Sequence, residues 1–243
     1  MASLIGLRKS IIPACDFTSL VTLNDLVTAT AKVPGIGGYK IGLLLGLTWG
    51  LREVVSRIRD ETDLPITYDH QKGGTDIPSP LGPGFALVLR KAGINAAILF
   101  PFGGRITEET WIKALQDQEV HVLVGAEMTQ EGFFARDDGF IADDAPLRMF
   151  ERAISLGVRD FVVPGNKTEA VKGYREYFER MLGEGNFTLY APGFISQGGD
   201  VSETGKVAGK DWHAIVGSAL YDQPDSSAMA RKAIQLTSQI TEA

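Results

Sequence analysis

Short apolar runs alternate along the chain with longer segments in which apolar residues recur every three or four positions. The short runs are typical of buried strands, and the longer segments are typical of helices that bury one face. Eight short runs occur, at 11–17, 38–42, 65–70, 96–102, 121–128, 160–165, 188–194 and 213–220. This alternation indicates βα units around a parallel sheet, so we expect an α/β fold, a closed (β/α)8 TIM barrel that occupies residues 1–243 as a single domain.

The helical segments show stripes of apolar residues that we expect to face the core. Three examples are Leu47, Leu51, Val54 and Ile58; Tyr174, Phe178 and Leu182; and Met229, Ala233, Leu236 and Ile240. The stretch 197–211, QGGDVSETGKVAGKD, is rich in glycine and polar residues, which favours a loop near the ligand.

Composition narrows the class of partner. The chain has 243 residues, 44% of them apolar, and a net charge of −6 without clustered lysine and arginine, which argues against a nucleic-acid surface. The longest apolar stretch, IGLLLGLTWG, is shorter than the ~20 residues that span a bilayer, and residues 1–10 do not resemble a secretory leader. Cys15 is the single cysteine, so no internal disulfide can form. We expect a cytoplasmic protein that binds a small molecule, with Cys15 in the core.

Polar residues close several of the apolar runs. Because active sites of such barrels lie at the carboxyl ends of the strands, these residues are the candidates for chemistry. Two lysines and three aspartates from the first three strand ends would converge at one mouth, where opposite charges shift each other's pKa. They are Asp16, Lys40, Asp69, Lys72 and Asp76, and later strands contribute Glu127, Met128, Thr129, Gln197, Gly217 and Ser218.

Residues 68–78, YDHQKGGTDIP, resemble the Asp-x-Lys-x-x-Asp-Ile-Pro signature of orotidine 5′-monophosphate decarboxylases. Other strand ends agree with that family in order, and the resemblance covers nearly the whole chain. The strand-end segments that agree are CDF with Asp16, YKIG with Lys40, GAEMTQEG with Thr129, FVVPG, APGFISQGGD with Pro192 and Gln197, and VGSALYDQPD.

The resemblance implies a carboxy-lyase that converts orotidine 5′-monophosphate into uridine 5′-monophosphate, a step of pyrimidine biosynthesis, without metal or organic cofactor. It makes Lys72 the proton donor and sets Asp69 against the departing carboxylate. Asp69, together with Lys40 and Asp76, would keep Lys72 charged and oriented. It also implies a homodimer, in which Asp76 reaches the ribose in the neighbouring subunit's site.

The same resemblance assigns the substrate contacts. Asp16 and Lys40 would bind ribose hydroxyls, and Thr129 would read the pyrimidine edge. Gln197 would bridge base and phosphate, with Pro192 also in the substrate-binding set.

Two features depart from the family pattern. Asp69, Lys72 and Asp76 have one extra residue in each gap, which Gly73 and Gly74 would absorb. Ser218 stands where the family has an arginine that grips the phosphate, and this change predicts weaker catalysis. Lys206 and Lys210 are the favoured substitutes and Arg8 a weaker one, while the backbone N–H groups of Gly217 and Ser218 would still cradle a phosphate.

Two other functions stay open. A magnesium-dependent sugar-phosphate synthase or decarboxylase of the same barrel suite would share the Asp and Lys framework, although Ile77, Pro78 and GAEMTQEG favour the nucleotide enzyme. A non-catalytic nucleotide-phosphate-binding barrel would explain Ser218 but has no need for the lysines and aspartates. His70 and His121 are expected to be hydrogen-bonded residues, not metal ligands.

Overall fold

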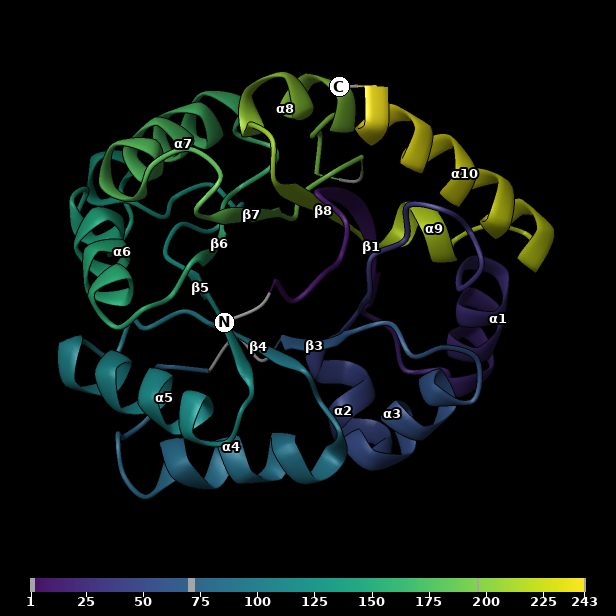
Figure 1. Cartoon of the computed structure of the whole chain (residues 1–243), viewed down its shortest axis with the longest axis horizontal. Coiled ribbons are helices and arrows are strands. Elements are labelled where there is room, and N and C mark those ends of the chain that lie inside the picture. Colours follow the sequence, from purple (N-terminus) through teal and green to yellow (C-terminus); the bar gives the residue numbers. More distant parts are fainter. Residues whose placement is uncertain (1–2, 70–72, 196, 243) are drawn as a thin grey trace.

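Eight parallel strands close into a barrel in the sequential order β1 to β8, with β8 returning to pair with β1 (Figure 1). This is a computed structural model, and it describes residues 3–69, 73–195 and 197–242. All eight predicted strands are confirmed, each within a few residues. They are β1 (Lys9–Cys15), β2 (Tyr39–Ile41), β3 (Ile66–Asp69), β4 (Ala96–Leu99), β5 (His121–Gly125), β6 (Asp160–Val162), β7 (Thr188–Ala191) and β8 (Trp212–Val216).

Helices surround the barrel as an outer ring (Figure 1). They are α1 (Leu20–Thr30), α2 (Leu43–Trp49), α3 (Leu51–Arg59), α4 (Leu81–Ala92), α5 (Arg105–Asp117), α6 (Ala145–Ser155), α7 (Thr168–Leu182), α8 (Val201–Ala208), α9 (Ser218–Tyr221) and α10 (Ser226–Glu242), with a 3-10 turn η1 at Ala135–Asp137. Among the described residues, no helix is long and apolar enough to cross a membrane.

The prediction of a loop over 197–211 is wrong, because α8 occupies Val201–Ala208. Asp200 caps this helix: its side chain accepts a hydrogen bond of 3.0 Å from the N–H of Glu203. A good N-cap satisfies a donor that the helix itself leaves free. Buried Val201, Thr204 and Ala208 then attach α8 to the barrel, so tertiary packing outweighs the weak helix propensity of Gly205 within it.

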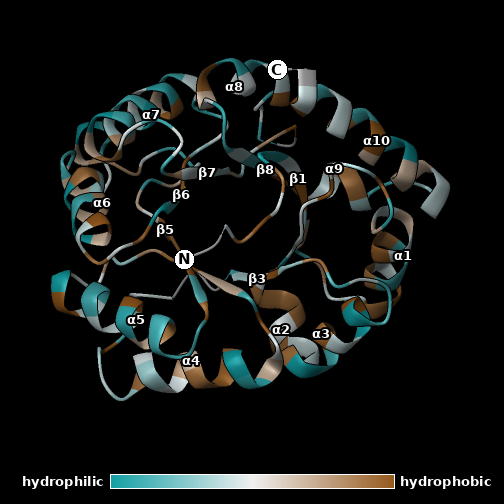
Figure 2. Cartoon of the chain, in the orientation of Figure 1, coloured by the Kyte–Doolittle hydropathy of each residue, from teal (hydrophilic) through white to brown (hydrophobic). Residues whose placement is uncertain are grey.

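The predicted helical stripes are confirmed in part. Met229, Ala233, Leu236 and Ile240 are all buried. The stripe that begins at Leu47 is interrupted, because Gly50 with φ 77° separates α2 from α3. Val54 and Ile58 of α3 are buried, whereas Leu47 is 72% exposed and is not a core residue. Figure 2 shows α2 as a largely hydrophobic helix beside β3.

The interior of the barrel holds a separate apolar layer. It consists of inward-facing strand residues, with Ile12, Ala14, Ala96, Ile98, Leu123, Val162 and Ile215 among them. The segment before β1 crosses the centre of the ring, and its Ile5, 3% exposed, packs against this layer (Figure 1). Filled barrel interiors of this kind leave the active site to the rim at the carboxyl ends of the strands.

Candidate active site

Three charged side chains meet at the carboxyl ends of the first three strands. Lys40 of β2 donates hydrogen bonds from Nζ to Asp16 Oδ1 at 3.0 Å and to Asp69 Oδ2 at 2.9 Å. Its side chain is 8% exposed, compared with 45% for Asp16 and 15% for Asp69. Burial lowers the pKa of Lys40, but the charges and hydrogen bonds of Asp69 and Asp16 outweigh it and raise that pKa above its ordinary value. Lys40 is therefore a fixed ammonium.

The sequence around β2 makes room for this contact. Gly42, directly after β2, lies against Asp16, and a Cβ at position 42 would overlap Asp16 Oδ1. The backbone of Gly42 has φ −87°, which other residues adopt without strain. Glycine is thus required here for space: it lets Asp16 approach Lys40.

Asp69 presents its second carboxylate oxygen without a partner. Oδ1 is buried and makes no hydrogen bond within the part of the chain that the structure describes. A buried carboxylate oxygen without a donor is costly, so this atom marks a place for a proton donor. Lys72, the residue predicted to lie beside Asp69, falls outside the described residues, as does His70.

Asp76 does not join the Lys40 cluster in the described part of the chain. It is exposed, and its Oδ1 accepts a hydrogen bond of 2.7 Å from the N–H of Ile77. Ile77 is itself 56% exposed. The structure therefore places Asp76 at the surface, two residues beyond Gly74, which adopts φ 84°. That glycine is one of the two expected to absorb the altered spacing.

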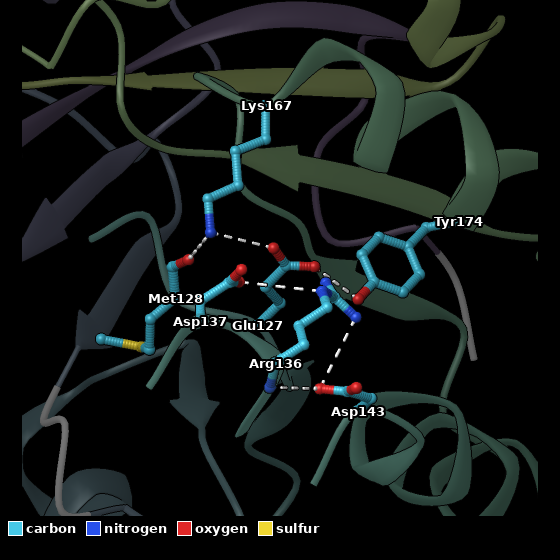
Figure 3. A network of polar contacts seen from close by, with 7 residues as sticks. All are labelled: Glu127, Met128, Arg136, Asp137, Asp143, Lys167 and Tyr174. Atoms are coloured by element: carbon cyan, nitrogen blue, oxygen red, sulfur yellow. Dashed lines mark hydrogen bonds and ion pairs between the residues drawn. The ribbon is translucent and has the colours of Figure 1, made fainter. Parts of the chain in front are cut away.

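A second polar network, shown in Figure 3, lies beyond the ends of β5 and β6. Glu127 is 6% exposed; it accepts hydrogen bonds from Lys167 Nζ at 3.0 Å and from the hydroxyl of Tyr174 at 2.6 Å. Lys167 also donates to the carbonyl of Met128 at 3.0 Å. Burial and Glu127 raise the pKa of Tyr174, which keeps its hydroxyl a donor. The network includes Met128, the residue directly before Thr129.

The predicted substrate-binding residues lie on the same rim. Thr129 follows β5, and its carbonyl accepts a hydrogen bond of 3.1 Å from Asn166 Nδ2. Pro192 follows β7, and its carbonyl accepts from the N–H of Gly165 at 2.8 Å. Gln197 is exposed in the segment before α8. Asn166 and Lys167 were missed by sequence reasoning, although polar residues directly after the strand-like run FVVPG were a usable signal.

Gly217 and Ser218 also occupy the rim, since β8 ends at Val216 and α9 begins at Ser218. The expected substitutes for the missing arginine are wrong. Arg8, Lys206 and Lys210 line a cavity of about 980 Å³ together with Lys9 and Gly35, which lie at or before the starts of β1 and β2. All three therefore lie at the amino end of the barrel, and their ion-pair partners are Asp211, Glu203 and Glu184.

His121 is a hydrogen-bonded residue, as expected. Its Nε2 lies 2.7 Å from Asp160 Oδ2, at the start of β5 and so at the amino end of the barrel. Within residues 3–69, 73–195 and 197–242, no group of three or more His, Cys, Asp or Glu side chains is arranged to hold a metal ion. Cys15 is buried, and burial raises the pKa of its thiol.

A closed barrel of eight parallel strands with charged groups at the carboxyl ends is the architecture of (β/α)8-barrel enzymes. In sequence, the chain is similar to two orotidine 5′-phosphate decarboxylases. It is 24% identical to that of Methanosphaera stadtmanae over 185 residues, 76% of each chain. It is 25% identical to that of Methanococcus maripaludis over 197 residues, 81% of this chain and 83% of the relative. No family model matches the chain.

Solved structures share the fold over nearly the full length. Orotidine 5′-monophosphate decarboxylase from Methanocaldococcus jannaschii, complexed with the inhibitor BMP, aligns with a TM-score of 0.80 at 20% identity and covers 96% of this chain and 98% of its own. The enzyme from Pyrococcus horikoshii aligns with a TM-score of 0.76 at 23% identity, covering 95% and 99%. The chain therefore resembles orotidine 5′-phosphate decarboxylases in sequence and shares their barrel.

Proposed function

We propose that this protein decarboxylates orotidine 5′-monophosphate to uridine 5′-monophosphate without a metal or organic cofactor. The observation that carries the proposal is the Lys40 ammonium, held between Asp16 and Asp69 at the strand ends. Such a preorganised set of charges stabilises negative charge that develops in a transition state. The similarity to named decarboxylases supplies the reaction in which that charge develops.

The proposed chemistry uses protein side chains alone. The bond between C6 and the carboxylate breaks, CO2 leaves, and the electron pair stays on C6. Lys72 stabilises this carbanion-like centre and then donates its proton to C6. Asp69, whose Oδ1 lacks a partner among the described residues, would sit against the departing carboxylate. The carboxylates of Asp69 and Asp76 would keep Lys72 charged, and Lys40, bound to Asp69, would orient the array.

The substrate would lie across the rim. We assign the ribose hydroxyls to Asp16 and Lys40, and the pyrimidine edge to Thr129. Gln197, with Pro192 beside it on the same loop, would bridge base and phosphate. Because Arg8, Lys206 and Lys210 lie at the other end of the barrel, we assign the phosphate to the backbone N–H groups of Gly217 and Ser218 and to the Ser218 hydroxyl.

We further propose a cytoplasmic homodimer in which Asp76 is contributed across the interface. The exposed apolar side chains of the segments after β2 and β3 support this assembly, because contiguous exposed apolar surface commonly marks an interface. These side chains are Leu43, Leu44, Leu47, Trp49, Ile77 and Leu81. Mixing two inactive variants, Asp76→Asn and Lys72→Ala, should restore part of the activity if sites are shared, and no recovery would contradict the shared site.

The test of function follows the ultraviolet absorbance of orotidine 5′-monophosphate with and without EDTA. We expect loss of the orotate chromophore at equal rates in both samples, and Lys72→Ala should abolish it. Activity on a sugar phosphate that depends on added Mg²⁺ would instead favour the magnesium-dependent sugar-phosphate synthase or decarboxylase. In the structure the Lys40 ammonium pairs with both Asp16 and Asp69 and offsets part of their charge, which leaves them poorer ligands for a divalent cation.

Binding of the nucleotide without turnover would instead identify a non-catalytic binding barrel. The buried Lys40 argues against that function, because a protein that only binds has no need to keep an ammonium in a position 8% exposed.

A further inference from the structure

We propose that Asn166 and Lys167, the two residues that follow the Pro164–Gly165 turn after β6, are positioning residues that set pyrimidine recognition by Thr129. The inference deepens the proposed function and rests on it. Neither residue would contact the substrate. Each would act through a main-chain carbonyl of the segment after β5, Met128–Thr129.

Lys167 holds the first of these carbonyls. Its Nζ lies 3.0 Å from the Met128 oxygen and 3.0 Å from Glu127 Oε1. The side chain of Lys167 is 31% exposed, while that of Glu127 is 6% exposed. Figure 3 shows the lysine reaching across from its own segment to both acceptors. Since a buried carboxylate needs a partner, Glu127 ties the ammonium to this position, and the Met128 carbonyl is held with it.

Asn166 holds the second carbonyl. Its Nδ2 donates to the Thr129 oxygen at 3.1 Å, and its Oδ1 is buried without a hydrogen-bond partner among the described residues. Gly193, with φ 103°, packs closely against both Asn166 and Thr129: a Cβ at position 193 would lie 3.1 Å from Thr129 Cγ2 and 3.2 Å from Asn166 Oδ1. The amide is therefore wedged between the segments after β5 and β7 and has little freedom to turn away from Thr129.

The two contacts together fix Thr129 from both sides. A peptide unit is planar, so holding the Met128 oxygen sets the direction of the Thr129 N–H in the same plane. Holding the Thr129 oxygen sets the following peptide plane. With both planes fixed, the Cα–Cβ bond of Thr129 has a defined direction, and the branched side chain then places its hydroxyl in one of few rotamers. Hydrogen bonds weaken steeply with misalignment, so this orientation decides how well the edge of a pyrimidine is read.

Arg136 provides an internal comparison. It is part of the same region in Figure 3, but it pairs with Asp137 and Asp143, each at 3.7 Å, and covers the ring of Phe134 at 4.1 Å. Among the described residues, its hydrogen-bond and ion-pair partners are Asp137 and Asp143, not Met128 or Thr129. Removing Arg136 therefore loosens the outer part of the loop and leaves the two carbonyl contacts in place.

The experiment compares two ligands by calorimetry: uridine 5′-monophosphate, and ribose 5-phosphate, which lacks the base. In Lys167→Met and in Asn166→Asp we expect the affinity for the nucleotide to fall about tenfold, because each loses the donor to one carbonyl. The affinity for ribose 5-phosphate should stay within about twofold. Lys167→Arg should restore nucleotide affinity, since it keeps a charged donor.

Three controls separate positioning from folding. Arg136→Gln and Asn186→Asp should leave both affinities unchanged; Asn186 donates to the Leu182 carbonyl at 2.9 Å, a similar contact elsewhere. The double variant Glu127→Gln, Lys167→Met removes the buried charge together with its partner. It should still lose nucleotide affinity, because the Met128 carbonyl stays unheld, and a thermal melt shows whether it folds.

An equal loss of affinity for both ligands in Lys167→Met and Asn166→Asp would overturn the proposal, because a general structural defect would then explain the effect. Unchanged nucleotide affinity in Lys167→Met and Asn166→Asp would overturn it as well. Failure of the wild-type protein to bind or decarboxylate the nucleotide is a different result, seen before any variant is compared, and it would remove the proposed function on which this inference rests.

Discussion

The two ends of the barrel interior handle buried polar groups in opposite ways. At the carboxyl end, Lys40 is kept charged between Asp16 and Asp69. At the amino end, Ser10 Oγ lies 2.7 Å from His213 Nδ1, and both residues are buried. The ring of Tyr190 packs on His213 with centroids 4.9 Å apart. Between the two ends lies the apolar layer that includes Ile12 and Ile215.

The amino end keeps its deepest groups neutral. Burial lowers the pKa of His213 to about 4, even though Asp160 and Asp211 act in the other direction. Burial, with Asp160, raises the pKa of Tyr190 well above its usual value. Desolvation therefore decides the protonation state here, whereas at the carboxyl end opposite charges override it. The fold thus keeps His213 and Tyr190 neutral beside the buried Asp160 at one end, and keeps an ammonium ionised between two aspartates at the other.

Removing the charge at the carboxyl end should have the largest effect. We expect Lys40→Met to lower kcat/KM about a thousandfold, because the preorganised cation contacts both aspartates at the mouth. Steady-state kinetics on orotidine 5′-monophosphate would measure this loss. Lys210→Met, which breaks an exposed pair with Glu184 at the amino end, is the matched control and should leave activity unchanged. Comparable losses in both variants would abolish the distinction between the two ends.

Moving one aspartate without changing any charge should have the next largest effect. In Gly42→Ala the new Cβ would overlap Asp16 Oδ1 and push the carboxylate away from Lys40. We expect kcat/KM to fall about a hundredfold while the barrel stays folded, because φ of −87° suits alanine. Gly84→Ala is the control, since a Cβ there meets nothing within 4 Å. Full activity in Gly42→Ala would show that the contact between Asp16 and Lys40 is dispensable.

Most of this charged site could be predicted from the sequence, because strand ends are recognisable. Lys40 and Asp69 lie within or at the end of strand-like runs and Asp16 directly follows one, and parallel strands bring such positions to one rim. The eight strands could be predicted for the same reason: buried strands have short, continuous apolar runs. The altered spacing around Lys72 gave no comparable signal, since a loop's path depends on packing that local sequence does not encode.

The errors came from segments that tertiary packing decides. Lys206 and Lys210 follow the seventh strand closely in sequence, but α8 carries them back to the amino end. Leu47 fits a helical stripe, yet the break at Gly50 turns it outward. Asn166 and Lys167 directly follow the strand-like run FVVPG, which marks them as rim residues. Their contacts with the Thr129 and Met128 carbonyls span 37 to 39 residues, however, and leave no local pattern.

The neutral amino end predicts an acid-sensitive stability. His213 has a folded-state pKa of about 4, below its unfolded value, so the unfolded chain binds the proton first as the pH falls. The stabilisation is complete above the unfolded pKa and is lost as the pH falls toward 4. At pH 5 the loss should be about 2 kcal/mol relative to pH 8. Glu108, whose pKa burial raises to about 8, titrates in the same range with the opposite sign, so the test is the difference between wild type and His213→Gln. Urea unfolding should show that wild type loses about 2 kcal/mol more than His213→Gln between pH 8 and pH 5, because the other groups contribute equally to both. An unchanged slope in His213→Gln would mean that His213 is not held neutral.

We expect the smallest effect from restoring the phosphate-binding arginine that Ser218 replaces. Ser218 begins α9 directly after β8, so Ser218→Arg would bring a guanidinium to the rim where we place the phosphate. A bidentate charged donor binds phosphate better than a hydroxyl does, so we expect the affinity for uridine 5′-monophosphate to rise about tenfold. Ser238→Arg adds the same charge near the end of α10, beside the cavity at the amino end, and should change nothing. Calorimetry at two salt concentrations would measure both variants. If Ser218→Arg does not bind the nucleotide more tightly, the phosphate is not held at the end of β8.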